Sequence, residues 1–251
     1  MDRAIGVFDS GVGGLSVLAE ARALLPAEDF VYYGDNGNAP YGEKSEGEIV
    51  ALTLAAVNVL LGENIKALVI ACNTATSAAA SILRQRLDIP VIGMEPALKP
   101  AQELRHGGRI LVMATPATLR LPKFDALMSL YGEGAVPVPV SGLVELIQSA
   151  ETTPEEIEQL VGRILAPYRR EHIDAIVLGC THYLFVRDLI AKAAGPEVKL
   201  VDGNLGTARQ LKRLLENRGL LRVAGEGCVK MMTSGEKGRY LPLMERLLRG
   251  T

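Results

Sequence analysis

The sequence predicts an α/β fold made of two similar α/β domains with mostly parallel sheets. Two patterns predict it. Short apolar runs rich in Val and Ile alternate with longer helical patterns, as expected for parallel strands that helices cover on both faces. The runs also fall into two sets of four, whose members match at an offset of 105 to 109 residues. A repeat this long indicates two related halves, and we expect a pseudo-twofold relation with the active site in the cleft between them.

The first half is predicted to contain four strands, at residues 4–8, 30–34, 66–71 and 89–94. The glycine-rich turn after the first strand leads into a helix expected over residues 15–25. A second helix is expected to begin after Ser45, which suits the N-cap position because an acidic turn follows it. The Ala-rich stretch at residues 75–87 predicts a third helix, directly behind the third strand.

The second half repeats this order, with strands expected at residues 109–114, 135–140, 174–179 and 198–202. Thr153 and Pro154, followed by two glutamates, indicate an N-cap, a proline at the first helical position and an acidic first turn. The end of the chain carries helical patterns at residues 208–217 and 241–248, and we expect it to pack back on the first half. The predicted domains are residues 1–97 with 208–251, and residues 98–207.

The composition is that of an ordinary folded protein and excludes several classes of function. Of the 251 residues, 48% are hydrophobic and 22% charged. The net charge of -2 and an aromatic content of 4% without Trp argue against binding to nucleic acid or anionic lipid. No apolar stretch reaches the roughly 18 residues that cross a bilayer, and the N-terminus shows no signal-peptide pattern. We therefore expect a cytoplasmic protein with reduced thiols and no nucleic-acid or membrane partner.

Three cysteines without a C-x-x-C spacing predict neither a disulfide framework nor a zinc site, and no metal or cofactor is expected. Two of them nevertheless occupy matching positions, because each ends a buried-strand pattern and begins a polar turn. The two turns are Cys72-Asn73-Thr74 and Cys180-Thr181-His182. Two thiols in the same setting, one from each half, suit a chemistry that removes a proton from one face of a substrate and adds one to the other.

Each cysteine also has a structural interpretation. For Cys72 the structural interpretation is that it is a small buried residue, as many free cysteines are. Its place ahead of the helix at residues 75–87 favours chemistry instead, because helix amides stabilise a thiolate. Cys180 has the same context, and His182 is placed to exchange or orient a proton. Cys228 lies in a Gly-Glu-Gly-Cys sequence without such a setting and is interpreted as structural or incidental.

Residues 9–14, Asp-Ser-Gly-Val-Gly-Gly, lie between a strand and a helix. Their glycines allow close approach of the backbone to a ligand, and the helix N-terminus favours an anion such as a carboxylate. They are not a dinucleotide fingerprint, since that motif requires glycine where the chain has Ser16. A tight turn capped by Asp9 or Ser10 is equally consistent with the sequence.

Two further turns are candidates for substrate binding. Tyr41 and Gly42 belong to a Pro-Tyr-Gly turn after the second strand, which suits closure over a substrate but is also an ordinary turn sequence. Thr115 and Thr118 follow the first strand of the second half and suit either carboxylate binding or helix capping. Ligands of open α/β sheets bind at the carboxyl ends of strands, so we expect these polar groups of both halves to surround one pocket.

Together these motifs resemble the glutamate racemases of the cofactor-independent aspartate/glutamate racemase superfamily, over nearly the whole chain. The motifs that carry the resemblance stand in the expected order: residues 5–14 (IGVFDSGVGG), 40–42 (PYG), 71–75 (ACNTA) and 178–183 (LGCTHY). The chain departs from the pattern at Leu184, where many relatives have proline, and in the loop at residues 35–38.

The resemblance implies a two-domain enzyme in which Cys72 and Cys180 interconvert L- and D-glutamate without a cofactor, with Asp9 and His182 as auxiliary proton-handling groups. The D-glutamate would serve peptidoglycan synthesis, and a homodimer is the expected assembly. The implied substrate contacts are Asp9, Ser10, Tyr41, Gly42, Asn73, Thr74, Thr115, Thr118, Thr181 and His182.

The expected mechanism is a 1,1-proton transfer, in which one cysteine as thiolate removes the α-proton and the other as thiol protonates the opposite face. Three alternatives stay open. The chain could be a sister racemase acting on aspartate or a hydantoin, or a redox protein in which Cys72 and Cys180 form a reversible disulfide. It could also be a non-catalytic binding protein, such as a regulator of a DNA enzyme.

Overall fold

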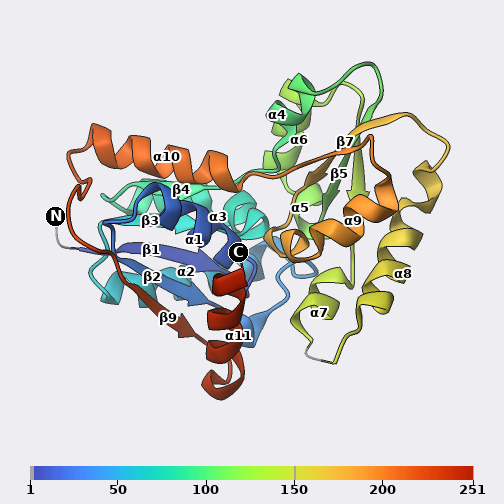
Figure 1. Cartoon of the computed structure of the whole chain (residues 1–251). Coiled ribbons are helices and arrows are strands. Elements are labelled where there is room, and N and C mark those ends of the chain that lie inside the picture. Colours follow the sequence, from blue (N-terminus) through green and yellow to red (C-terminus); the bar gives the residue numbers. More distant parts are fainter. Residues whose placement is uncertain (1–2, 150, 251) are drawn as a thin grey trace.

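A computed structural model describes residues 3–149 and 151–250, and the strands of this part form two parallel sheets that lie side by side (Figure 1). Sheet A has five strands in the order β4-β3-β1-β2-β9. They are β1 (Ile5–Asp9), β2 (Phe30–Gly34), β3 (Ala67–Ile70), β4 (Val91–Gly93) and β9 (Val229–Thr233). The register pairs Val7 of β1 with Tyr32 of β2 on one side and with Val69 of β3 on the other.

Sheet B has four parallel strands in the order β6-β5-β7-β8. They are β5 (Arg109–Ala114), β6 (Ala135–Pro139), β7 (Ile173–Leu178) and β8 (Lys199–Val201). The first four strands of sheet A and the four of sheet B follow the same spatial order, so the repeat seen in the sequence has a counterpart in space. The predicted fold class, two α/β units with parallel sheets, is confirmed, and each predicted strand lies within two residues of its expected ends.

Eleven α-helices and three short 3-10 segments connect the strands in the described residues. The α-helices are α1 (Leu15–Leu24), α2 (Glu46–Gly62), α3 (Asn73–Arg86), α4 (Leu98–Glu103), α5 (Pro116–Arg120), α6 (Pro122–Tyr131), α7 (Leu143–Gln148), α8 (Pro154–Leu165), α9 (Arg187–Ala194), α10 (Asn204–Asn217) and α11 (Lys237–Gly250). The 3-10 segments are η1 (Asn36–Asn38), η2 (Ala166–Tyr168) and η3 (Thr181–Val186). Ser45 and Thr153 cap α2 and α8 as the sequence predicts, each within a complete capping box.

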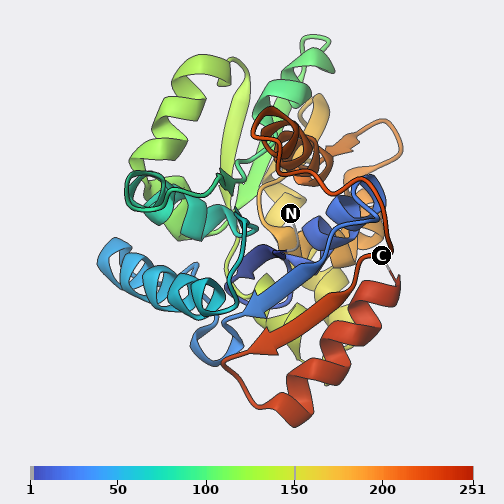
Figure 2. The same cartoon turned by 90° about the vertical axis from the view of Figure 1, so that its left-hand side faces the viewer.

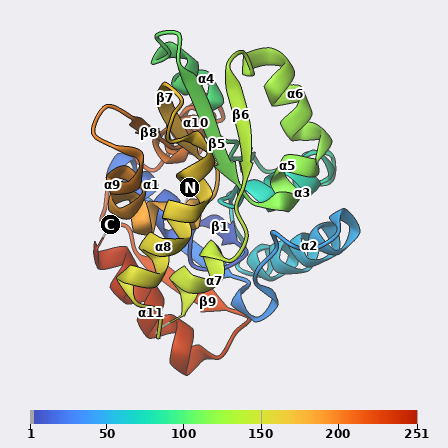
Figure 3. The same ribbon diagram turned by 90° about the vertical axis from the view of Figure 1, so that its right-hand side faces the viewer.

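Helices cover both faces of each sheet, which explains why the central strands are mostly apolar. Helices α2 and α3 pack on one face of sheet A, and α1, α10 and α11 on the other (Figure 2). Helices α7, α8 and α9 pack on one face of sheet B, and α4 and α6 on the other (Figure 3). The two sheets are therefore rigid supports for the side chains at their strand ends.

The chain crosses from sheet A to sheet B after β4 and returns after β8. The returning segment packs on the first half, with α10 against α1, but it also contributes a strand that the sequence analysis missed. Strand β9 reads Val-Lys-Met-Met-Thr, has few β-branched apolar residues, and pairs only with β2 at the sheet edge. The predicted division at 207/208 falls inside α10, and the domain boundaries stay a prediction.

A buried ion pair holds the returning segment at the amino ends of the sheet A strands. Lys66 Nζ lies 2.6 Å from Glu28 Oε2, and both side chains are at most 1% exposed. Lys66 also donates to the Leu220 carbonyl at 2.9 Å, and Glu28 accepts the Arg222 amide at 2.8 Å. The pair thus joins the residues before β2 and β3 to the chain that leads into β9.

Replacing Lys66 by Met should lower the free energy of unfolding by about 3 kcal/mol, because the Glu28 carboxylate would stay buried without its counter-charge. Urea denaturation measures the loss, and the double variant Lys66→Met/Glu28→Gln should recover part of it. The matched control is Lys230→Met, which breaks a more exposed pair with Glu63 and should cost less than about 1 kcal/mol. Equal losses in the two lysine variants would contradict this role for the buried pair.

Candidate active site

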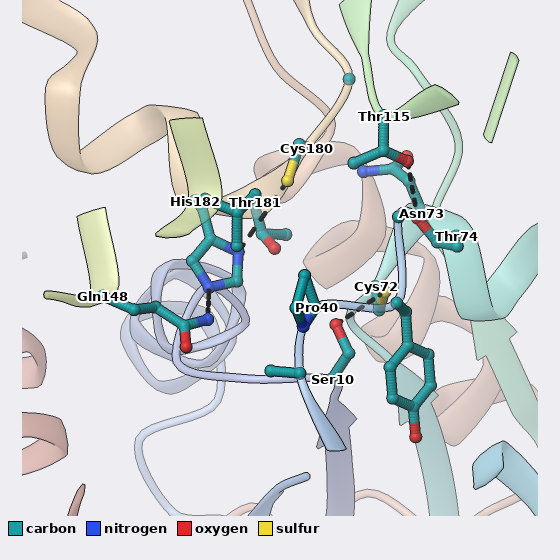
Figure 4. Close-up of a pocket in the computed structure, with 15 residues that line it drawn as sticks. Ser10, Pro40, Cys72, Asn73, Thr74, Thr115, Gln148, Cys180, Thr181 and His182 are labelled. Carbon is teal, nitrogen blue, oxygen red and sulfur yellow. Dashed lines mark hydrogen bonds between the residues drawn. The ribbon is translucent and has the colours of Figure 1, made fainter. Parts of the chain in front are cut away.

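The carboxyl ends of strands from both sheets meet at one small pocket (Figure 4). Its lining residues are Ser10, Ala39, Pro40, Tyr41, Gly42, Cys72, Asn73, Thr74, Thr115, Val144, Gln148, Gly179, Cys180, Thr181 and His182. Ten of the twelve residues singled out in the sequence are among them, and the other two, Asp9 and Thr118, are buried with contacts to lining residues. The parallel strands bring these residues together because β1, β3, β5 and β7 all end at this junction.

Cys72 stands between β3 and α3, where it is the N-cap residue of the helix. Its sulfur accepts the Ala75 amide at 3.4 Å and lies 3.3 Å from Ser10 Oγ. Burial raises the pKa of the Cys72 thiol to about 11, with a further rise from the nearby Asp9 charge that the Ser10 and Ala75 contacts oppose only in part. Cys72 is therefore a thiol at neutral pH, and its sulfur is already in contact with the Ser10 hydroxyl and the Ala75 amide.

Cys180 occupies the matching position between β7 and η3, so the two thiols reach the pocket from different sheets. Its sulfur lies 3.8 Å from His182 Nδ1. Burial raises the pKa of the Cys180 thiol above its usual range, while the backbone amides of His182 and Tyr183 act in the opposite direction. Burial also lowers the pKa of His182 to about 4, so the imidazole is neutral at physiological pH.

Asp9 ends β1 and is fully buried. Its carboxylate accepts the Gly11 amide at 2.7 Å and the Thr181 hydroxyl at 3.3 Å, which links the two sheets. Burial raises the pKa of Asp9 to about 7, although hydrogen bonds from the glycine turn and from Thr181 lower it in part. Asp9 can therefore hold or release a proton near neutral pH.

Three threonine hydroxyls form a closed cluster at the other end of the pocket. Thr74, Thr115 and Thr118 lie 2.9 Å from one another, and Thr118 stands behind the other two. Gly42 is adjacent, and a Cβ there would lie 2.8 Å from the Thr115 Cβ, so this close approach requires glycine. The cluster offers hydroxyl donors of the kind that bind a carboxylate.

The side chain of Asn73 is 3% exposed and lines the pocket, yet neither its amide nitrogen nor its amide oxygen has a hydrogen-bond partner. A buried amide without partners is costly, so a polar ligand is the natural partner for it. Tyr41 differs, because its hydroxyl already donates to Asp35 at 2.6 Å. The phenol group is thus committed to the loop, and only the rest of the side chain is free to contact a ligand.

Five lining residues were not among the predicted site residues: Ala39, Pro40, Val144, Gln148 and Gly179. Val144 and Gln148 come from α7, a six-residue helix that follows no recognisable strand-end motif. A sequence signal for them was therefore lacking.

Within the described residues, no group of three or more His, Cys, Asp or Glu is arranged for a metal ion. Nor does any helix there have the length and apolar character to cross a membrane.

These features define the class of the protein: two parallel-sheet α/β units with a pair of buried thiols at their shared pocket. The model of the Asp/Glu/hydantoin racemase family matches residues 14–211, more than half of the chain. The chain belongs to this family.

Individual relatives agree with this assignment. A glutamate racemase of Clostridium botulinum (strain Langeland) is 48% identical over 249 residues, which are 98% of this chain and 97% of the relative. The crystal structure of a glutamate racemase isoform from Bacillus anthracis matches with a TM-score of 0.88 at 33% identity, covering 98% and 94% of the two chains. That of the glutamate racemase from Francisella tularensis in complex with D-glutamate matches with a TM-score of 0.84 at 29% identity, covering 99% and 94%.

The raised pKa of Asp9 predicts a distinct dependence of stability on pH. Between its unfolded pKa of 3.8 and its folded pKa of about 7, the folded state binds the proton more strongly, so the free energy of unfolding falls as pH rises. His182 has the opposite effect between pH 4 and 6.5, because its folded pKa is lowered. Asp9→Asn should therefore gain stability relative to the wild type from pH 4 to pH 8, by up to about 4 kcal/mol.

Denaturant titrations of the wild type and of Asp9→Asn from pH 4 to pH 8 measure the difference between their free energies of unfolding. His182 is present in both proteins, so its contribution cancels in this difference. Asp188→Asn on the exposed side of α9 is the control and should leave the slope unchanged. Parallel stability curves for the wild type and Asp9→Asn would contradict the raised pKa.

Proposed function

We propose that the chain interconverts L- and D-glutamate by a two-cysteine 1,1-proton transfer. The observation that carries the proposal is the pair of buried thiols, Cys72 and Cys180, which line one pocket from different sheets. The family and the glutamate racemases among its relatives support the substrate. One thiolate removes the α-proton, and the thiol on the opposite side donates a proton to the other face, so each enantiomer uses a different cysteine as base.

The carbanion-like charge that develops during proton removal spreads onto the α-carboxylate of the substrate. Hydrogen-bond donors aimed at that carboxylate stabilise the transition state more than the ground state. Ser10, Asn73 and Thr181 line the pocket. Ser10 Oγ lies 3.3 Å from the Cys72 sulfur, whereas Asn73 and Thr181 directly follow the two cysteines in the sequence. The Asn73 amide is still without a partner. We assign these groups to the α-carboxylate.

The threonine cluster suits the second carboxylate of a dicarboxylic amino acid. Thr74 and Thr115 line the pocket, and Thr118 hydrogen bonds to both, which leaves hydroxyl donors oriented as a group. A hydantoin ring has no second carboxylate for such a cluster to bind. Aspartate does, but its side chain is shorter by one methylene, so the distance between the two carboxylate sites separates aspartate from glutamate.

Electrostatics in the pocket favour reaction only when a substrate is bound. The pKa of Cys72 is raised to about 11 and that of Cys180 is raised as well, so both are thiols at neutral pH. The α-ammonium of an amino acid brings a positive charge into the same low-dielectric space, which stabilises a thiolate. Asp9, whose charge acts on Cys72, and His182, which contacts Cys180, are the neighbouring groups for proton exchange.

The pocket has only about 20 Å³ of free space, room for about one water molecule. Glutamate is larger, so it enters only when the two halves move apart, and closure then removes water from the reacting atoms. D-glutamate made in this way would serve peptidoglycan synthesis in the cytoplasm, and we expect the enzyme to act as a homodimer.

Replacing either reactive cysteine by serine should reduce racemisation of both enantiomers by at least about 100-fold, because a hydroxyl is a far weaker acid and base than a thiol. Circular dichroism with L- and with D-glutamate measures the rates. Cys228→Ser is the matched control, since that cysteine is exposed and away from the pocket, and it should retain the wild-type rate. Near-wild-type racemisation in both Cys72→Ser and Cys180→Ser would eliminate the mechanism.

Two further measurements separate the alternatives. In D₂O, solvent deuterium should enter the α-position of the product, which neither a redox protein nor a binding protein would cause. A panel of glutamate, aspartate and a hydantoin should show the highest kcat/KM for glutamate, and a preference for either of the others would replace the proposed substrate.

A further inference from the structure

Gln148, the last residue of α7, contacts the histidine next to Cys180. Its amide nitrogen lies 2.7 Å from His182 Nε2 (Figure 4). The other ring nitrogen, Nδ1, lies 3.8 Å from the Cys180 sulfur. The imidazole therefore stands between Gln148 and Cys180, with one nitrogen facing each of them.

The glycine turn of sheet A fixes the ring in this place. A Cβ on Gly13 would lie 2.5 Å from His182 Nδ1, and one on Gly11 would lie 3.1 Å from Nε2 and 2.5 Å from the Gln148 amide nitrogen. Only glycine allows the backbone to pack so closely against the histidine and the glutamine. His182 is 2% exposed, so solvent does not compete for its two nitrogens.

The proton on the ring has a definite place in this arrangement. A neutral imidazole carries one proton, so one nitrogen donates a hydrogen bond and the other accepts one. The amide nitrogen of a glutamine can only donate. With that nitrogen facing Nε2, Nε2 is the acceptor, and the proton lies on Nδ1.

We infer that Gln148 is a positioning residue for Cys180: its amide holds His182 with the proton on Nδ1, so that the ring donates a hydrogen bond to the Cys180 sulfur. A donor at this position stabilises the thiolate over the thiol. The role matters for catalysis only if Cys180 acts as a base, and in that respect it rests on the proposed function.

The contact of His182 with Cys180 compensates for a difference in the donors that surround the two cysteine sulfurs. Cys72 precedes a 14-residue α-helix and also has Ser10 beside it. Cys180 precedes only the 3-10 segment η3, and burial raises its pKa further from the usual range. His182 supplies Cys180 with an additional donor, and Gln148 holds the histidine in the tautomer that donates.

Nuclear magnetic resonance of the protein labelled with ¹⁵N at histidine tests the tautomer directly. The chain has three histidines, and the signals of His182 are those lost in His182→Gln. In the substrate-free wild type at pH 7.5, Nδ1 should be protonated and Nε2 bare. Gln148→Glu has the same shape but only accepts hydrogen bonds, so Nε2 should become protonated in that variant. A protonated Nε2 in the wild type would overturn the inference.

Alkylation by iodoacetamide tests the effect on the sulfur. In a Cys72→Ser/Cys228→Ser background, the added Gln148→Met should slow modification of Cys180 at fixed pH about tenfold, which corresponds to a rise in its pKa of about one unit. Mass spectrometry follows the reaction. Glu145→Gln, exposed on the same helix, is the matched control and should leave the rate unchanged. An unchanged rate in Gln148→Met would overturn the positioning role.

These measurements also separate the inference from the proposed function. A wild type with Nδ1 protonated but without racemisation would support the positioning of His182 and contradict the proposed activity. An active enzyme in which Nε2 is protonated would support the proposed activity and contradict the positioning of His182 by Gln148. If Gln148→Met does not fold, as judged by circular dichroism, the tautomer of the wild type decides the question alone.

Discussion

Burial of ionisable groups at the junction of the two sheets is the constraint on which the rest of the site depends. Asp9, Cys72 and Cys180 are all buried there, and burial is the largest cause of the raised pKa of each. The same burial makes every hydrogen bond in the pocket stronger than it would be in water. Both cysteines are therefore held as neutral thiols, whereas Asp9 changes its charge near neutral pH. In the proposed reaction, a ligand that carries both an ammonium and carboxylates compensates for the charge that proton removal creates.

Hydrogen bonds and apolar contacts join the two halves at this junction. The Thr181 hydroxyl of the sheet B side donates to Asp9 of sheet A, and the Ala117 amide donates to the Gly42 carbonyl at 2.9 Å. The Thr74 hydroxyl lies 2.9 Å from that of Thr115. These contacts are individually weak, and all of them involve groups that line or adjoin the pocket. The proposed opening would break these hydrogen bonds, and the substrate would then bind several of the donors that they release.

Much of this arrangement could be predicted from the sequence, because it follows from local patterns. Apolar runs predicted the strands, and the position of Cys72 and Cys180 at strand ends placed each thiol at the carboxyl edge of the sheet of its own half. Strand β9 escaped notice because an edge strand needs neither a continuous apolar run nor β-branched residues. Gln148 escaped because its contact with His182 depends on how α7 packs across the pocket, a long-range relation that no spacing in the sequence encodes. The auxiliary contacts of a site are in general less visible than its strand-end motifs for this reason.

The two halves match in topology but not in electrostatics, and the proposed reaction tolerates that difference. Cys72 has helix amides and Ser10 as donors, whereas Cys180 depends on a histidine whose proton Gln148 positions. Because enantiomers have equal free energies in solution, kcat/KM must be equal in the two directions, whatever the environment of each thiol. Asymmetry between the thiols therefore leaves the ratio of the two kcat/KM values at one, and changes only their common size and how kcat and KM are divided in each direction. Loss of a donor at either thiol would therefore lower kcat/KM for both enantiomers by the same factor, so each thiol requires donors of its own.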